Sequence, residues 1–499
     1  MIKEYEPYKK LLDITYKHYL PFLRSEEGDR VLLYDPVDKK VIGAHYGETH
    51  LGAAFIIGGM LFDKDEVVQK GIEIIKGFIA HSGEFQKSPA YHWDFNNFAL
   101  CVLYEFLINN NSLSELSGML KGFILKQKDS NNATVNWHPM RLYVNSLKYK
   151  WTNDARYLDV IKKCREVISS AQYKDGFFED LLPKGTSFNF QYHVYTTASI
   201  AFLNRHIGEK TGDLDAAISR VEDIIDSEGD LNYLGRGTNQ IFAWGPAIYL
   251  LSLLEDKSSY DKALSFINDR GLRAVEKDNL ILNEYDGEDK IWWWDYHYSS
   301  VYIAHYLFWM MLTAYEKNSL DYSYNKTAES DSGVHIHNEK NYVVIFDGRR
   351  HYLAESGKVI ADICDSNGRA LFKGAFGPYY KEYGYKYSIP QNTVHNFIGV
   401  LRQKNIFGRF TEKPIYPESI DAETDNDRMV ITINYSSALK DIVVNLPWFD
   451  KVPPTVLDEQ GNSIRLTNTG QFAGPYGSTN LFQSKAVTVS KLKLVIGDN

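Results

Sequence analysis

Five segments of the sequence place polar and aromatic side chains together, where an ordinary hydrophobic core would not accept them. They are 91–97 (YHWDFNN), 136–141 (NWHPMR), 175–180 (DGFFED) leading to 190–195 (FQYHVY), 235–240 (GRGTNQ) and 292–298 (WWWDYHY). Tyr and Trp combine a flat apolar face with a polar edge, which is complementary to the CH faces and hydroxyl rims of sugars. His and Tyr can also transfer protons. Such segments could bind a carbohydrate and act on it by acid–base chemistry.

Arg236 lies between Gly235 and Gly237, so a ligand could approach the backbone closely at this point. An arginine there is suited to holding a carboxylate with two parallel hydrogen bonds. Purely structural roles for these residues are open as well. Arg236 could form a structural ion pair, His92 and His138 could be capping or core histidines, and the 292–294 tryptophans could pack helices together.

The elements that must position these segments are helices up to about residue 325. Apolar residues repeat at helical spacing in 67–79, 98–108, 157–168, 197–206, 216–225, 241–254 and 301–315. Ten to twelve helices fit, and their recurrence every 40–60 residues favours hairpins stacked in a ring or arc. Each of the five segments precedes or opens a helix. In a ring of hairpins they would therefore converge on one cleft.

After residue 325 the helical spacing of apolar residues gives way to short runs of β-branched and aromatic residues. These runs are 342–346, 359–363, 397–401, 429–433, 441–446 and 486–494, and they are spaced like the strands of an antiparallel sandwich. A polar linker falls within 317–332. We therefore predict an α+β multidomain chain, with a helical domain over 1–320 and a β-sandwich domain over 333–499.

Composition excludes several classes of protein. Hydrophobic residues make up 44% and charged residues 24%, as in folded proteins. The net charge of −9 comes without a basic patch, which argues against a nucleic acid partner. The sequence contains no run of 18 apolar residues, so we predict no membrane span. The N-terminus also lacks the apolar stretch of a signal peptide. We expect a cytoplasmic protein, or a secreted or periplasmic one if a signal was removed.

The metal-binding residue types are scattered. Cys101, Cys164 and Cys364 are far apart in sequence and form no zinc or disulfide pattern. The histidines lack tight ligand spacing as well. We expect no cofactor and no catalytic metal, while the oligomeric state is not encoded in any visible pattern.

The order of the motifs resembles that of the (α/α)-toroid polysaccharide lyases. The matching series is Asn136-Trp137, then 175–180, then a Tyr-rich helix start, then Gly235-Arg236-Gly237. The resemblance extends to the chondroitin/hyaluronate lyase group and to the heparinase II/III-like group. Over about residues 90–310 the resemblance is in the order of the motifs, and in the β region it is only in the pattern of short β-branched and aromatic runs. It implies an N-terminal (α/α) toroid followed by antiparallel β-sheet, and a polysaccharide or oligosaccharide as partner.

The resemblance also implies roles for individual residues. Asn136 and Trp137 take the place of the family's aromatic patch, with His138 where a second Trp is usual. The histidine expected near position 181 is absent. Tyr192 is the nearest match to the catalytic Tyr, and Tyr195 is a close second. Arg236 corresponds to the family's Arg.

The chemistry implied is β-elimination at a uronic acid. Arg236, Asn97 or Asn136 would neutralise the carboxylate while the C5 proton leaves. We assign Tyr192 as the acid, leave open whether it is also the base, and assign His193 as its helper, with His92 and His351 as alternatives. The expected substrate-binding residues are His92, Trp93, Asn97, Trp137, His138, Asn239, Trp244, Trp293 and His297.

Two other functions compete with the lyase. A toroid glycoside hydrolase would need two carboxylates across the sugar, for which Asp94, Asp180 and Asp295 are candidates beside aromatic residues. A carbohydrate-binding protein could keep the same fold without the chemistry.

Overall fold

The structure is a computed structural model of the 499-residue chain. It describes residues 5–26, 30–184, 190–233, 240–278, 299–316, 324, 334–338, 342–347, 358–376, 400–404, 410–414, 417–425, 428–442, 444–474 and 477–497.

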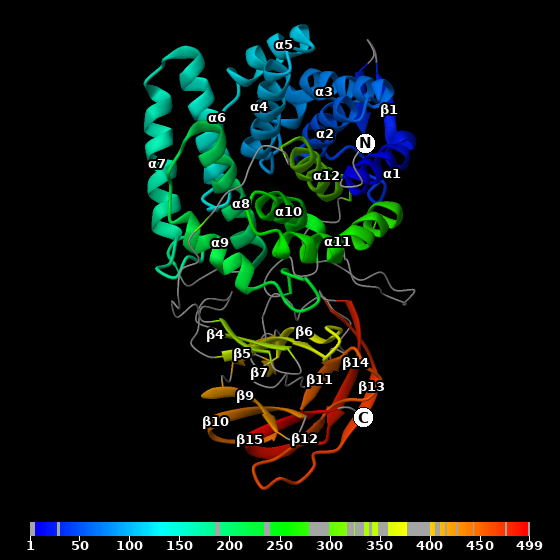
Figure 1. Ribbon diagram of the computed structural model, residues 1–499, viewed down its shortest axis with the longest axis vertical. Helices are drawn as coiled ribbons and strands as arrows, with labels where there is room; N and C mark the ends of the chain where they lie inside the picture. The colour runs from blue at the N-terminus through cyan, green and yellow to red at the C-terminus, as the bar shows by residue number, and fades with distance from the viewer. Residues whose placement is uncertain are drawn as a thin grey trace.

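Twelve α-helices lie in the described part of the first 316 residues (Figure 1). They are α1 (Glu6–Tyr19), α2 (Gly47–Leu61), α3 (Asp65–Phe85), α4 (Trp93–Asn109), α5 (Ser114–Ile124), α6 (Trp137–Thr152), α7 (Arg156–Ala171), α8 (Phe190–Ile207), α9 (Leu214–Asp223), α10 (Trp244–Ser252), α11 (Ser258–Lys277) and α12 (Ser299–Glu316). Two single 3₁₀ turns, η2 (Leu20–Phe22) and η3 (Ile241–Ala243), and a small hairpin of β1 (Leu23–Glu26) with β2 (Arg30–Leu33) accompany them.

The even-numbered helices form a closed inner ring. They contact one another in the order α2, α4, α6, α8, α10 and α12, and α12 returns to α2. Each odd-numbered helix packs outside the ring: α3 on α2, α5 on α4, α7 on α6, α9 on α8, α11 on α10, and α1 on α11 and α12. The contacts therefore confirm the predicted toroid of helical hairpins.

Burial explains why each helix takes its place in this double ring. In α12 nearly every side chain is buried, so this helix must have neighbours on all sides. In α7, by contrast, the buried residues Ile161, Cys164 and Ile168 recur at spacings of three and four, and they form one stripe that ends at Ala171. A helix with a single apolar stripe is stable only with its other face in water. The pattern of apolar residues thus sorts the helices into inner and outer positions.

The C-terminal part consists of antiparallel sheets. The strands are β3 (Val334–Asn338), β4 (Tyr342–Asp347), β5 (Lys358–Cys364), β6 (Ala370–Phe376), β7 (Val400–Lys404), β8 (Phe410–Pro414), β9 (Ser419–Asp425), β10 (Arg428–Ile442), β11 (Asn445–Trp448), β12 (Thr455–Leu457), β13 (Leu466–Gly474), β14 (Gly477–Ser484) and β15 (Val487–Ile496). They pair in the orders β3-β4-β5-β6, β7-β8, β12-β15-β10-β9 and β11-β14-β13.

One hydrophobic core joins residues of β4–β6 with residues of β9, β10, β11, β14 and β15. The predicted β region is therefore present. Its description as a two-sheet sandwich, and the boundaries 1–320 and 333–499, stay predictions. The predicted linker 317–332 lies outside the described residues apart from position 324.

Strands β4, β5 and β6 lie between the helical ring and strands β9, β10, β12 and β15 (Figure 1). Ala361 and Cys364 of β5 pack into the helical core rather than into the β core. The two parts of the chain therefore share a buried junction. No helix among the described residues is both long enough and apolar enough to cross a membrane.

Candidate active site

A cavity of about 690 Å³ opens at one end of the inner ring. It is lined by Tyr46, Pro89, Ala90, Tyr91, His92, Trp93, Phe95, Lys128, Asp129, Ser130, Asn131, Asn132, Thr134, Asn136, Trp137, Asp180, Leu181, Gln191, Tyr192, Phe242 and Tyr302. Every inner helix contributes at its N-terminal end: Tyr46 precedes α2, Phe242 precedes α10, and the others open or precede α4, α6, α8 and α12. The toroid thus brings the N-termini of the inner helices to one site.

Aromatic rings form much of the cavity wall. The rings of Tyr46 and Phe95 are stacked with their centroids 4.4 Å apart, and Phe95 meets Trp137 edge-on at 5.3 Å. The Phe242 ring has its centroid 6.4 Å from that of Phe95 and meets Tyr302 edge-on at 5.6 Å. Rings held by such contacts lose little freedom when a ligand stacks on them.

His92 is held in one tautomer at the edge of this wall. Its Nδ1 is 2.7 Å from the carbonyl oxygen of Ala90. A carbonyl oxygen only accepts, so Nδ1 carries the proton and Nε2 is the basic nitrogen of the neutral ring. Burial lowers the pKa of His92 to about 4, against the raising effect of hydrogen bonds to the backbone of Ala90 and Ala44. The imidazole is therefore neutral at physiological pH.

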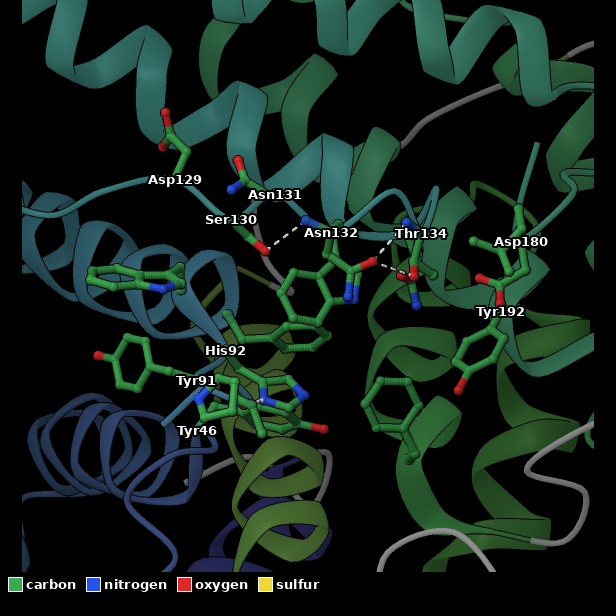
Figure 2. A pocket seen from close by; sticks show the side chains of 18 of the residues that line it. Tyr46, Tyr91, His92, Asp129, Ser130, Asn131, Asn132, Thr134, Asp180 and Tyr192 are labelled. Carbon is green, nitrogen blue, oxygen red and sulfur yellow. Dashed lines mark hydrogen bonds between the residues drawn. The ribbon is translucent and has the colours of Figure 1, made fainter. Parts of the chain in front are cut away.

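The 128–134 loop forms the roof of the cavity, and a chain of hydrogen bonds fixes its shape (Figure 2). The backbone N–H of Asn132 donates to Ser130 Oγ at 2.9 Å, and the backbone N–H of Thr134 donates to Asn132 Oδ1 at 2.8 Å. Arg141 donates from Nη2 to the carbonyl of Asn132 at 3.0 Å and to Asp94 Oδ2 at 2.8 Å. Asp94 thus supports the roof from behind and does not line the cavity.

Among the lining residues that the structure describes, the charged ones are Lys128, Asp129 and Asp180. Asp129 Oδ1 accepts a hydrogen bond from Asn145 Nδ2 at 3.0 Å. Figure 2 draws Asp180 and Tyr192 on one side of the cavity, with Tyr46, Tyr91 and His92 on the other. The side chains alone give the described lining a charge of −1 when both carboxyls are ionised.

Five of the predicted site residues line this cavity. They are His92, Trp93, Asn136, Trp137 and Tyr192. The Oδ1 atom of Asn136 is buried and has no hydrogen-bond partner among the described residues. A further four predicted residues, Arg236, Asn239, Trp293 and His297, lie outside the described residues, as do Asp295 and His351.

Five other predicted residues are not in the lining: Asn97, His138, His193, Tyr195 and Trp244. Asn97 is buried and donates from Nδ2 to the carbonyl of Lys128 at 3.0 Å, so it supports the roof from inside. Trp244 is fully buried and stacks on Phe266 of α11 at 4.9 Å. Neither side chain is in the described lining, and their role in substrate binding stays a prediction.

The three residues nearest the expected chemistry, His138, His193 and Tyr195, are outside the described lining as well. His138 is buried and its Nδ1 lies 3.1 Å from the carbonyl of Thr134. His193 is buried in the ring, where its Nδ1 accepts the backbone N–H of Phe178 at 3.2 Å. Tyr195 is also fully buried, with its hydroxyl 3.2 Å from a methionine sulfur.

The contrast between Tyr192 and Tyr195 follows from helix geometry. The α8 helix begins at Phe190, so both tyrosines are helical and lie on similar faces. Three residues of rise, about 4.5 Å, place Tyr195 deeper in the ring than Tyr192. Only the tyrosine in the first turn reaches the cavity.

Sequence reasoning missed several lining residues, among them Tyr46, Asp129, Asn132, Phe242 and Tyr302. The polar run 129–134 (DSNNAT), directly before the Asn136-Trp137 motif, was a signal for a shaped loop. Phe242 and Tyr302 carried no such signal, because an aromatic residue at the start of an apolar helix looks like core.

Comparison with known proteins gives distant similarities only. No protein-family model matches the chain, and no curated protein matches it. The GH76A α-1,6-mannanase of Salegentibacter sp. HEL1_6 is 11% identical and has a TM-score of 0.42, over 62% of this chain and 98% of the mannanase. A polysaccharide lyase is 12% identical with a TM-score of 0.40, over 63% and 99%. The cellobiose 2-epimerase of Bacillus thermoamylovorans B4167 is 12% identical with a TM-score of 0.40, over 61% and 98%. At these TM-scores, none of the three similarities identifies a family or an activity.

Proposed function

We propose that the cavity binds a carbohydrate chain and that the protein cleaves this chain by β-elimination beside a uronic acid. The observation that carries the proposal is that one aromatic cavity is lined both by His92, a neutral histidine with a defined basic nitrogen, and, across from it, by Tyr192. The cavity volume of about 690 Å³ is within the range of small-molecule sites.

The proposed reaction moves one proton at each of two positions. His92 Nε2 takes the C5 proton of the uronate, the C4–C5 double bond forms, and the C4–O bond breaks. Tyr192 gives its hydroxyl proton to the leaving oxygen; afterwards His92 releases the C5 proton to water and Tyr192 takes one up from water. The amide of Asn136 and the ammonium of Lys128 hold the carboxylate while charge develops on it, a task in which Arg236 would join.

Substitution of the acid and the base tests the assignment. Tyr192→Phe removes the donor, and His92→Asn keeps a donor toward Ala90 while removing Nε2. Each should lower kcat by about 10²–10⁴-fold, the usual contribution of a general acid or base. Tyr104→Phe is the matched control, because Tyr104 packs on Trp151 away from the cavity and its loss should leave kcat unchanged.

The assay is the absorbance of the 4,5-unsaturated uronate released from a panel of uronate polysaccharides. Full activity in Tyr192→Phe would refute its role as the acid. A panel on which no unsaturated product forms would refute the elimination itself.

A second candidate, a glycoside hydrolase, is favoured by the two carboxyl groups in the lining. Hydrolysis needs an acid and a second carboxylate across the glycosidic bond. Asp180 and Asp129 could supply them, whereas Asp94 is paired with Arg141 behind the roof. New reducing ends without the ultraviolet product, lost in Asp180→Asn, would establish the hydrolase. Binding without either product would leave a carbohydrate-binding protein.

A further inference from the structure

A buried ionic cluster joins the helical ring to the β3–β6 sheet, away from the cavity. The Nζ atom of Lys373 on β6 lies 2.7 Å from Asp226 Oδ2, 2.8 Å from Asp230 Oδ2 and 3.1 Å from Glu228 Oε2. The three acidic residues follow α9, so the contacts connect segments about 140 positions apart in the chain. Asp362 on β5 completes the cluster of carboxyl groups.

Counted over the residues that the structure describes, the charges in this cluster do not balance. Four carboxyl groups face the ammonium of Lys373 and the guanidinium of Arg270, which pairs with Glu228 at 2.8 Å. Asp362 is completely buried, and within the described part of the chain its Oδ1 has no hydrogen-bond partner. Leaving a carboxylate oxygen buried and unpaired is costly, so something else must compensate it. With all four carboxyls ionised, two positive charges are missing.

Three ligand atoms converge where those charges are needed. The carboxylates of Asp226 and Asp362 and the Sγ of Cys364 all lie within 4.8 Å of one another, and all three residues are buried. The distance from Cys364 Sγ to Asp362 Oδ2 is 3.4 Å. Bond lengths of about 2.0–2.3 Å around a tetrahedral zinc ion place neighbouring ligands at roughly that separation.

The orientation of Asp226 is fixed from behind. Its Oδ1 accepts the backbone N–H groups of Gly229 and Asp230, each at 2.8 Å. Its other oxygen, Oδ2, faces the sheet, where it accepts from Lys373 Nζ at 2.7 Å. Second hydrogen bonds of this kind orient the carboxylate ligands of metal sites.

We propose that Asp226, Asp362 and Cys364 bind a divalent cation that accepts a thiolate, of which Zn²⁺ is the type. Thiolate and carboxylate ligands together select zinc over magnesium or calcium, which prefer oxygen alone. On binding, the Cys364 thiol releases its proton to solvent and the sulfur bonds to the metal. With the thiolate included, four carboxylates and one sulfur face two cationic side chains, and the ion lowers this deficit from three charges to one. It also ties β5 to the segment after α9.

The site has a connection to the cavity. The backbone N–H of Asn232 donates to Asp230 Oδ1 at 2.9 Å, and Asn232 Nδ2 is 3.4 Å from Oε1 of Gln191, which lines the cavity. An ion held by Asp226 would therefore be linked to one wall of the cavity through Asp230 and Asn232.

The rival explanation is a proton. If Asp362 is protonated, the cluster needs less added charge, and the Cys364 thiol simply donates to the carboxyl group. The two explanations differ in metal content and in the response to Asp362→Asn, which mimics the protonated acid.

The test is to produce the full chain in medium in which Co²⁺ replaces Zn²⁺, so that the buried site fills during folding. We expect about one metal ion per chain by mass spectrometry and a thiolate-to-cobalt charge-transfer band in the near ultraviolet. Cys364→Ser should lose the band. Cys164→Ser is the matched control, because this buried cysteine on α7 is outside the cluster and the band should remain.

Two outcomes would overturn the proposal. The first is wild-type protein that carries no stoichiometric metal after growth in zinc or cobalt, a measurement that needs no variant to fold. The second is an Asp362→Asn protein at least as heat-stable as the wild type, with a melting temperature that a chelator changes in neither. That result would assign the missing charge to a proton.

Discussion

Asp94 stabilises the roof of the cavity through a buried ion pair with Arg141. Replacing it should therefore lower the free energy of unfolding of the whole protein. The side chains of Asp94 and Arg141 are 1% and 8% exposed, and Arg141 donates to Asp94 Oδ2 from both Nε, at 3.1 Å, and Nη2, at 2.8 Å. Asp94→Asn leaves the guanidinium buried without its counter-charge. Breaking a buried pair in this way costs about 3–5 kcal/mol of the free energy of unfolding.

This loss converts to a melting shift through the unfolding entropy. If the helical ring of about 300 residues unfolds as one unit, an entropy of roughly 2.1 cal/mol/K per residue gives a fall of about 5–8 °C. Differential scanning calorimetry measures it. Asp154→Asn is the matched control, because Asp154 pairs with Arg156 in solvent and its loss should not change the melting temperature measurably.

The double variant Asp94→Asn/Arg141→Gln separates the lost charge from lost packing. It should recover part of the loss, because no unpaired charge remains. The activity of Asp94→Asn should fall through KM more than through kcat, since Ser130 and Asn132 lose their supports in the roof. An Asp94→Asn protein that melts like the control, or one that is stable but loses kcat entirely, would refute this structural role.

Two further predictions concern pH and one concerns binding. Burial lowers the pKa of six described histidines well below 6.5: His45, His50, His92, His138, His193 and His305. Between about pH 4 and 6.5 the unfolded chain therefore binds more protons than the folded one, and the melting temperature should fall as the pH drops through that window. If His92 is the base, kcat should stay level down to about pH 4 and fall below it, measured at a temperature where the fold is intact; a fall centred near pH 6.5 would contradict the cause given. Trp137→Ala should weaken oligosaccharide binding by about tenfold in calorimetry, whereas Trp151→Ala at the far end of the same helix should not.

Much of the helical ring could be predicted from the spacing of apolar residues. In α7 the buried stripe repeats at three and four residues, and this alone indicates an outer helix. In α12 the apolar residues cover all sides, so periodicity says only that the helix is central. The closure of the ring depends on contact between α12 and α2, which are about 250 residues apart and share no local signal.

The candidate site could be predicted in part for the same reason. Motifs at helix starts predicted His92, Asn136 and Tyr192, because the ring gathers the N-termini of its inner helices. How far along its helix a residue lies from the cavity could not be predicted. Tyr195 was therefore predicted as a site residue, although it is buried inside the ring. The partners of Lys373 could not be predicted either, since a lysine in a strand and acidic residues after a helix are ordinary until the chain folds.

The direction of the inner helices also bears on the substrate. The lining side chains carry −1, which would repel a uronate. However, α4, α6 and α8 begin at residues in or beside the cavity wall, and each N-terminus carries roughly half a positive charge from its unpaired N–H groups. Three such ends give about +1.5, which exceeds the side-chain deficit within the first turn of each helix. The electrostatic potential at the aromatic wall therefore favours an anionic sugar. The carboxyl groups of Asp129 and Asp180 repel only a substrate that reaches the roof or Asp180. On this argument the position of the uronate along the cavity, and not the net charge of the lining, decides between elimination and hydrolysis.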